Sequence, residues 1–130
     1  MTFSISLPTR HTDTFASTGF VHGGVLLALT ELAYAAFEQH VGISKPATVV
    51  SVQRETTATY MAPLPWQDGA TIEVRTTAAD ERSFTQQFTV LSTASGRTIA
   101  SIVHVWAWLD TESGRSVKLD SQTQRRLMDG

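Results

Sequence analysis

The stretch that decides the fold is GFVHGGVLLALTELAYAAF, residues 19–37. Three glycines lead into a run rich in Ala and Leu, which are strong helix formers. The run predicts a helix that begins near Gly23 and continues to about Val41. We expect it to end at Gly42, because glycine is the usual residue just after a helix.

Glu31 is the side chain in this stretch that points most directly to function. Apart from the weakly acidic phenol of Tyr34, it is the only ionisable group between Gly23 and Phe37. A carboxylate in an apolar helix loses hydration, so it needs a partner or a chemical task. It is either satisfied by backbone donors or an arginine such as Arg54, or it is catalytic. Catalysis is favoured, because such acids gather at functional sites.

The remaining sequence predicts an antiparallel sheet. A short strand is expected at 3–7, and beyond Pro46 the apolar pattern changes to period two. Further strands are expected at 48–60, 70–79, 83–92 and 97–109. Short turns at 68–69, 80–81 and 95–96 favour pairing of consecutive strands. One long central helix wrapped by a curved antiparallel sheet is an α+β plan.

The helix has almost no polar face, so it must be covered on nearly every side. One subunit alone would leave part of the helix and an edge strand bare, and self-association is therefore expected. The tail at 110–130 is polar, with a short helix expected from Asp120 to Leu127. We assign this tail no function.

Composition excludes several classes of function. The chain has 130 residues, which fits a single domain over 1–130. A net charge of -2 with ten scattered basic residues gives no stripe for nucleic acid. There is no cysteine, and the four histidines lie far apart, so no metal site is expected. Without an apolar run of about 18 residues or a leader, we expect a soluble cytoplasmic protein with no membrane partner.

The start of the helix is a candidate oxyanion site. The first turn has unpaired backbone N–H groups and a partial positive charge. Gly23 and Gly24 remove side chains that would keep a carbonyl from those groups. The alternative is that the two glycines only give the loop room against the helix. His22 is either a capping and positioning residue or a general base, and its place in the sequence does not decide between them.

Helix geometry separates Gly23 from Glu31. At about 1.5 Å rise per residue, eight residues place them roughly 12 Å apart along one axis. A single carbonyl cannot touch both. If two copies of the helix run antiparallel across a twofold axis, Glu31 of one lies level with Gly23 of the other. Small residues such as Gly24 and Ala28 would let the helices approach, and the site would belong to a dimer.

These residues resemble a known family. The pattern Gly-Phe-Val-His-Gly-Gly-Val-Leu with an acid nine positions after the histidine is similar to that of hotdog-fold acyl-CoA thioesterases, of the phenylacetate-pathway and Arthrobacter-type 4-hydroxybenzoyl-CoA kinds. The similarity continues through Tyr60-Met61-Ala62-Pro63-Leu64 and the turn at 68–69, and covers roughly residues 10–110.

The resemblance implies a hotdog fold, a homodimer or pair of dimers, and hydrolysis of an acyl-CoA thioester at the subunit interface. It makes Glu31 the nucleophile or general base, and it makes the Gly23 N–H the group that polarises the carbonyl. His22 would shape the loop, while Arg82 and Ser83 fall near where relatives hold the CoA phosphates. CoA is part of the substrate, so no separate cofactor is implied.

The chain departs from the family at several positions. A branch that uses the second aspartate of Asp-Thr-Asp is excluded, because this chain reads Asp13-Thr14-Phe15. Ala16 and Ala35 stand where relatives have a glutamine and a threonine, although Ser17 or Thr18 are candidates to compensate.

These departures keep two alternatives open: a non-catalytic acyl-CoA-binding or regulatory module, and a hotdog 3-hydroxyacyl thioester dehydratase. The acyl group is not specified by the sequence. Four aromatic residues are candidates either for its pocket or for the core: Phe15, Phe20, Tyr34 and Phe37.

Overall fold

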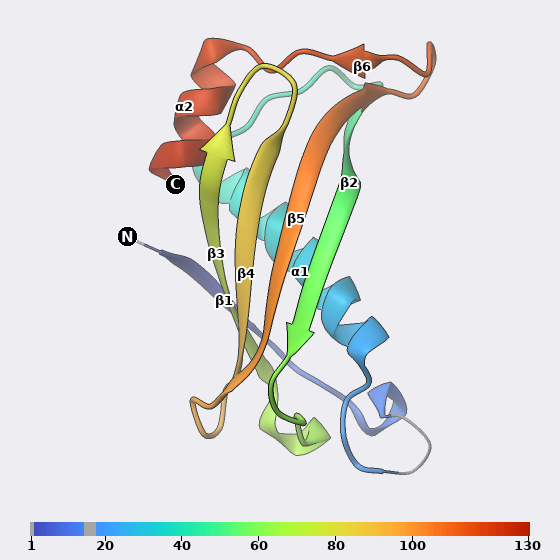
Figure 1. The fold of residues 1–130 in the computed structure, drawn as a ribbon, viewed down its shortest axis with the longest axis vertical. Coiled ribbons are helices and arrows are strands. Elements are labelled where there is room, and N and C mark those ends of the chain that lie inside the picture. Colours follow the sequence, from blue (N-terminus) through green and yellow to red (C-terminus); the bar gives the residue numbers. More distant parts are fainter. Residues whose placement is uncertain (1, 15–17) are drawn as a thin grey trace.

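The computed structural model describes residues 2–14 and 18–130. In this part of the chain, six strands form one antiparallel sheet accompanied by two helices (Figure 1). The strands are β1 (Phe3–Leu7), β2 (Val49–Tyr60), β3 (Ala70–Ala79), β4 (Phe84–Ser92), β5 (Thr98–Asp110) and β6 (Ser116–Val117). The helices are α1 (Gly23–Val41) and α2 (Ser121–Asp129), and two short 3-10 turns are η1 (His11–Asp13) and η2 (Trp66–Asp68).

The strand order is β1-β3-β4-β5-β2, with β6 beside β5. The five longer strands begin and end within one residue of the predicted positions. The predicted pairing of consecutive strands is correct for β3, β4 and β5 but wrong for β2, which pairs with β5 and not with β3. The reason lies in residues 61–69, where Pro63, Pro65 and η2 replace a tight hairpin and carry the chain to the other side of the sheet.

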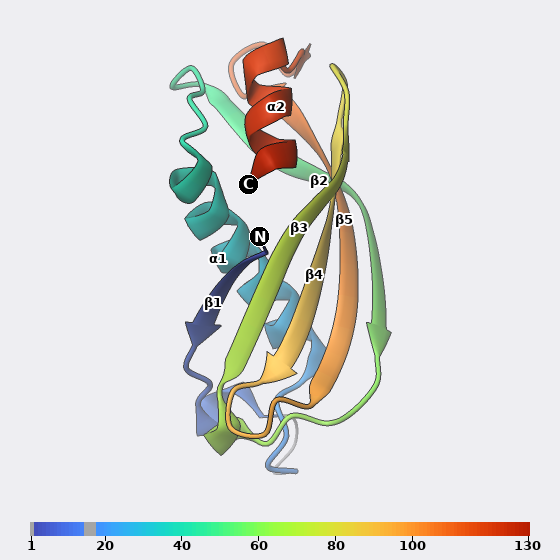
Figure 2. The same cartoon turned by 90° about the vertical axis from the view of Figure 1, so that its left-hand side faces the viewer.

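Helix α1 has the predicted ends. His22 precedes it in extended conformation, and Gly42 follows it with φ +73°, a left-handed angle that favours glycine. The Gly42 N–H donates to the carbonyl oxygens of Glu38 and Gln39, which closes the last turn. The helix spans 19 residues and lies along one face of the curved sheet (Figure 2).

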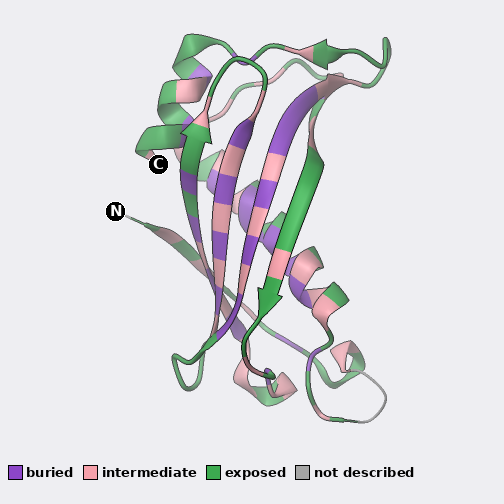
Figure 3. Ribbon diagram, viewed as in Figure 1, coloured by how far each residue is buried: buried purple, intermediate pink, exposed green. Residues whose placement is uncertain are grey.

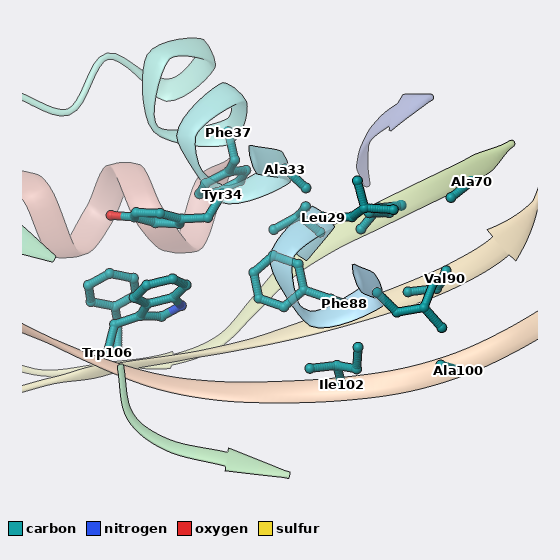
Figure 4. Packing of buried hydrophobic residues seen from close by; sticks show 14 of the residues in the cluster. Leu29, Ala33, Tyr34, Phe37, Ala70, Phe88, Val90, Ala100, Ile102 and Trp106 are labelled. Atoms are coloured by element: carbon teal, nitrogen blue, oxygen red, sulfur yellow. The ribbon is translucent and has the colours of Figure 1, made fainter. Parts of the chain in front are cut away.

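The core lies between α1 and the inner face of the sheet (Figure 4). Tyr34 stacks on Trp106 with ring centroids 4.3 Å apart. Phe37, Phe88 and Ile102 are fully buried beside them. Burial of these large apolar side chains fixes the position of α1 on the sheet.

The opposite flank of α1 is open. Four of its residues, Gly24, Ala28, Glu31 and Ala35, are exposed, and so is 56% of Leu32. Ala28 and Leu32 line an open pocket with residues from the end of β1 and from η1, and β2 is exposed along much of its length (Figure 3). A single chain therefore does not cover α1 on nearly every side, as the sequence predicted. Strand β2 is a largely exposed edge strand, which is also expected of one subunit alone.

Strand β2 contains a β-bulge. Gln53 lies opposite Trp106 and Glu55 lies opposite Val105, so Arg54 has no opposite residue on β5. The extra residue changes which side chains face α1, because side chains of a regular strand alternate between the two faces. Four side chains of β2 form hydrogen bonds toward α1 or the inner face of β5: Ser51, Gln53, Thr56 and Tyr60.

The C-terminal segment includes the short helix expected near 120–127. Asp120 caps α2, and its carboxylate accepts a hydrogen bond from the Thr123 N–H at 2.7 Å. Leu119 and Leu127 are buried against the core. The segment also contributes β6, which the sequence analysis did not predict.

Candidate functional site

The loop before α1 is held by backbone hydrogen bonds. The Val21 N–H donates to the Leu64 carbonyl at 2.8 Å, and the His22 N–H donates to the Asp13 carbonyl at 3.1 Å. The Asp13 side chain accepts from the Arg10 N–H at 2.8 Å. These contacts fix the direction in which the first N–H groups of the helix point.

Both glycines at the helix start lie under aromatic rings. A Cβ on Gly23 would lie 3.0 Å from the Tyr60 ring and hydroxyl, and a Cβ on Gly24 would lie 3.0 Å from the His22 imidazole. The Tyr60 hydroxyl also donates to the Gly23 carbonyl at 3.3 Å. The two glycines therefore give Tyr60 and His22 room at the helix start.

A pocket of about 490 Å³ opens beside this helix start. Its lining is apolar apart from the Tyr60 hydroxyl and the backbone: Val21, Gly23, Leu26, Tyr60, Met61, Ala62, Pro63 and Leu64. Among the described residues, no hydrogen-bond acceptor is found for the N–H groups of Gly23 and Gly24. The pocket therefore combines backbone donors with apolar walls, and none of its lining residues is acidic.

Glu31 lies two turns further along α1, on the open flank. It is exposed, and its Oε1 accepts a hydrogen bond from Gln53 Nε2 at 3.1 Å. No arginine or lysine of the described residues forms an ion pair with it, so the expected alternative of a pair with Arg54 is wrong. Within one chain, Glu31 is neither buried nor among the residues that line the pocket at Gly23.

Arg82 and Ser83 lie at the opposite end of the molecule from the helix start (Figure 1). Both N–H groups donate to the Asp80 carboxylate, which lowers the pKa of Asp80. Arg82 lines a second pocket of about 470 Å³ together with Arg54 and Lys118. The structure thus brings His22, Gly23 and Gly24 together and leaves Arg82 and Ser83 apart from them within one chain.

Two buried polar groupings were not predicted. His104 is 1% exposed, and its ring nitrogens lie 2.7 Å from the Thr30 hydroxyl and 2.8 Å from the Thr56 hydroxyl. Burial lowers the pKa of His104. A histidine inside an otherwise apolar strand is the sequence signal for this grouping.

The second grouping surrounds Tyr34. Its hydroxyl donates to Glu38 at 2.6 Å and lies 2.8 Å from the Ser51 hydroxyl, while Lys45 pairs with Glu38 at 2.8 Å. Burial, with a smaller effect of Glu38, raises the pKa of Tyr34 far above its usual range. Tyr34 is therefore a core residue with a satisfied hydroxyl.

The other predicted positions divide between the loop and the core. Phe37 is fully buried in the core, whereas 41% of Phe20 is exposed. Thr18 accepts a hydrogen bond from the Phe20 N–H at 3.2 Å within the loop. Phe15, Ala16 and Ser17 lie outside the described residues.

Residues 2–14 and 18–130 hold no cluster of three or more histidine or acidic side chains that would suit a metal ion. Within the same ranges, neither helix has the length and apolarity needed to cross a membrane.

The sequence matches the family model described as the thioesterase-like superfamily over residues 11–127. The chain belongs to the thioesterase-like superfamily. The match confirms the family predicted from the His-Gly-Gly pattern and supports thioester hydrolysis as the general class of activity. A search of curated protein sequences found no match to this chain.

Solved structures show that the superfamily member has the hotdog fold of known thioesterases. A 1,4-dihydroxy-2-naphthoyl-CoA thioesterase from Synechocystis has a TM-score of 0.83 and 15% identity, covering 98% of this chain and 96% of its own. A thioesterase from Thermus thermophilus, solved with coenzyme A and zinc, has a TM-score of 0.78 and 23% identity, covering 95% and 90%. A Staphylococcus aureus protein solved with CoA has a TM-score of 0.84 and 12% identity, covering 97% and 81%.

Proposed function

We propose that this protein is an acyl-CoA thioesterase whose active site forms between two copies of the chain. One observation carries the proposal: the pocket beside Gly23 has N–H donors but no acid, whereas Glu31 is a carboxylate on an open flank. The pocket lacks a carboxylate, and Glu31 lacks nearby oxyanion donors. A second copy of the chain would place its Glu31 at the pocket of the first copy, and the reverse.

An antiparallel pair of α1 helices is the arrangement that joins the two halves. The roughly 12 Å between Gly23 and Glu31 on one helix is then bridged across the twofold axis. The exposed small residues Gly24, Ala28 and Ala35 let the backbones approach, and the exposed Leu32 gains cover. A homodimer therefore has two equivalent sites, and a pair of such dimers remains a prediction.

In this site the thioester carbonyl oxygen accepts hydrogen bonds from the helix start, with the Gly23 N–H as the principal donor. The helix dipole stabilises the negative charge that develops on this oxygen. The partner copy's carboxylate at position 31 either removes a proton from water as the water attacks, or attacks the carbonyl carbon itself. In both cases the C–S bond breaks and CoA leaves as a thiolate that takes up a proton. In the first route the attacking water becomes part of the free acid. In the second route an acyl–glutamyl anhydride forms, and water then hydrolyses it to the free acid and the regenerated carboxylate.

The second pocket is the proposed site for the CoA phosphates. Arg82, Arg54 and Lys118 place three cations around it, and the one acidic lining residue, Glu81, pairs with Lys118 at 4.0 Å. Phosphate oxygens are favourable partners for such a group of cationic side chains. The CoA ligands named for two of the structural neighbours support a ligand of this kind.

Glu31→Gln is the direct test of this function. The substitution keeps the shape of the side chain and removes its charge, so thiol release should fall at least about a hundredfold. The dimer and its thermal stability should be unchanged. Glu112→Gln, the same change on an exposed turn, is the control and should keep full activity. Unchanged turnover by Glu31→Gln would refute the proposal.

Mixed dimers test whether the site is shared. A chain with Glu31→Gln and a chain with Gly23→Val are each expected to be inactive alone. When the two are refolded together, one site of each mixed dimer combines an intact Gly23 with an intact Glu31. Activity should therefore return, and its absence in verified mixed dimers would argue for a site within one chain.

A second candidate is a module that binds acyl-CoA without turning it over. Ala35 favours it, because the family resemblance places a threonine there and α1 exposes only a methyl group. Calorimetric binding of acyl-CoA with no thiol released by the wild-type protein would select this candidate.

A further inference from the structure

Gln53 makes the one hydrogen bond found for the Glu31 carboxylate among the described residues. Its amide Nε2 lies 3.1 Å from Glu31 Oε1, and a carboxylate accepts whereas an amide N–H donates. No partner is found for Oε2 among those residues. One oxygen is thus held, and the other is available on the open flank.

The β-bulge is what brings Gln53 to this position. Thr56 faces inward, where its hydroxyl bonds His104. In a regular strand the inward side chains before Thr56 would be Arg54 and Val52, and Gln53 would point to the other face. The extra residue reverses this alternation, so Gln53 turns toward α1.

We propose that Gln53 is a positioning residue that holds Glu31 in its reactive orientation. This inference rests on the thioesterase function proposed above. A hydrogen bond from the Gln53 amide limits rotation of the Glu31 carboxylate toward solvent. Gln53 does not line the pocket at Gly23 or the pocket at Arg82, so it acts on the reaction through Glu31.

Two other groups of ionisable side chains near α1 have partners of their own. Tyr34, Glu38 and Lys45 bond one another, and His104 bonds two threonine hydroxyls. The contact between Gln53 and Glu31 is therefore separate from both groups.

The test compares Gln53→Met with Gln87→Met. Methionine has a similar length and no N–H. Gln87 is a matched control, because its Nε2 donates to the Ser101 hydroxyl at 2.7 Å on the outer face of the sheet. We expect Gln53→Met to lower kcat roughly tenfold, the size of a lost hydrogen bond to a charged group. KM should stay within about twofold, and Gln87→Met should match the wild type.

Gln53→Glu adds a second variant that retains a polar side chain at this exposed position. Its carboxylate repels Glu31 at neutral pH, so kcat should fall below that of Gln53→Met. If both Gln53 variants keep the wild-type kcat while Glu31→Gln is inactive, the positioning role is wrong and the thioesterase function stands. If Glu31→Gln is itself active, the proposed function fails. Dimer content and thermal midpoint of every variant separate these outcomes from misfolding.

Discussion

At the scale of single residues, the helix start is shaped by one aromatic ring. Tyr60 lies so close to Gly23 that any side chain at residue 23 would force the ring or the helix start to shift. The same closeness keeps the ring beside the unpaired N–H groups, where it forms one wall of the pocket. The ring therefore limits both what residue 23 can be and how a substrate carbonyl can enter.

Gly23→Ala should lower kcat at least about tenfold, because the new methyl group forces Tyr60 or the helix start to move away from the geometry that oxyanion donors need. Combining it with Tyr60→Ala restores the space, so the double variant should recover part of the lost activity. Thioester hydrolysis measured for the two single variants and the double variant checks this. Full activity of Gly23→Ala would show that the N–H of residue 23 is not a donor to the substrate.

His104 predicts a pH dependence of stability. Burial lowers its pKa below the ordinary value, and its neighbours are two hydroxyls and the rings of Phe88 and Trp106. The unfolded chain therefore binds a proton more readily than the folded one. The contribution to stability is present above about pH 6.5 and is lost as the pH falls toward the lower folded value.

Urea unfolding at pH 7.5 and pH 5.5 measures this effect. The wild-type midpoint should fall over the interval, and His104→Asn should show a smaller fall. Equal falls in the wild type and His104→Asn would contradict the prediction.

At the scale of elements, the end of α1 depends on a left-handed residue. Gly42→Ala is expected to cost about 1 kcal/mol, because an L side chain is strained at a φ of +73°. The added Cβ meets only the flexible end of Arg126, so the strain is in the backbone. Chemical denaturation should show the loss while kcat stays unchanged. A more stable Gly42→Ala protein would refute the argument.

Strand positions were predictable from sequence because each strand carries its own period-two pattern between turn residues. The sequence did not predict which side chains of β2 face α1. Its alternating pattern places four residues on one face: Val50, Val52, Arg54 and Thr56. The bulge at Arg54 instead puts the two valines on the face away from α1. The register is set by β5 across the sheet, and no local signal in β2 shows where the extra residue falls.

At the scale of the whole molecule, the sequence identified Glu31 and the helix start but not the groups around them. Tyr60 and Gln53 reach α1 from β2, which is separated from the helix by the loop at 42–48. Such contacts are decided by the packing of complete elements, so spacing along the chain does not reveal them. The same is true of the Thr30–His104–Thr56 grouping, which joins three elements.

Leu32→Glu tests the proposed pairing of helices. Leu32 is 56% exposed on the open flank, and a glutamate there would bring an unpaired charge into the apolar contact between the two helices. The variant should be monomeric in sedimentation experiments at concentrations where the wild type is a dimer, and its thiol release should fall in parallel. Met128→Glu changes an apolar side chain of similar exposure on α2 and should remain a dimer. A dimeric Leu32→Glu protein would place the interface elsewhere.

The bulge in β2 has a consequence for how this gene can change. Gaining a single codon between those for Ser51 and Thr56 would turn the first half of the strand over, exchanging Ser51 and Gln53 for two valines at the helix. A codon gained in the polar hairpin at residues 93–96 would alter only an exposed bend. Among homologues, insertions should therefore collect in that hairpin, and no single-residue insertion should separate positions 51 and 56 even where their amino acids differ.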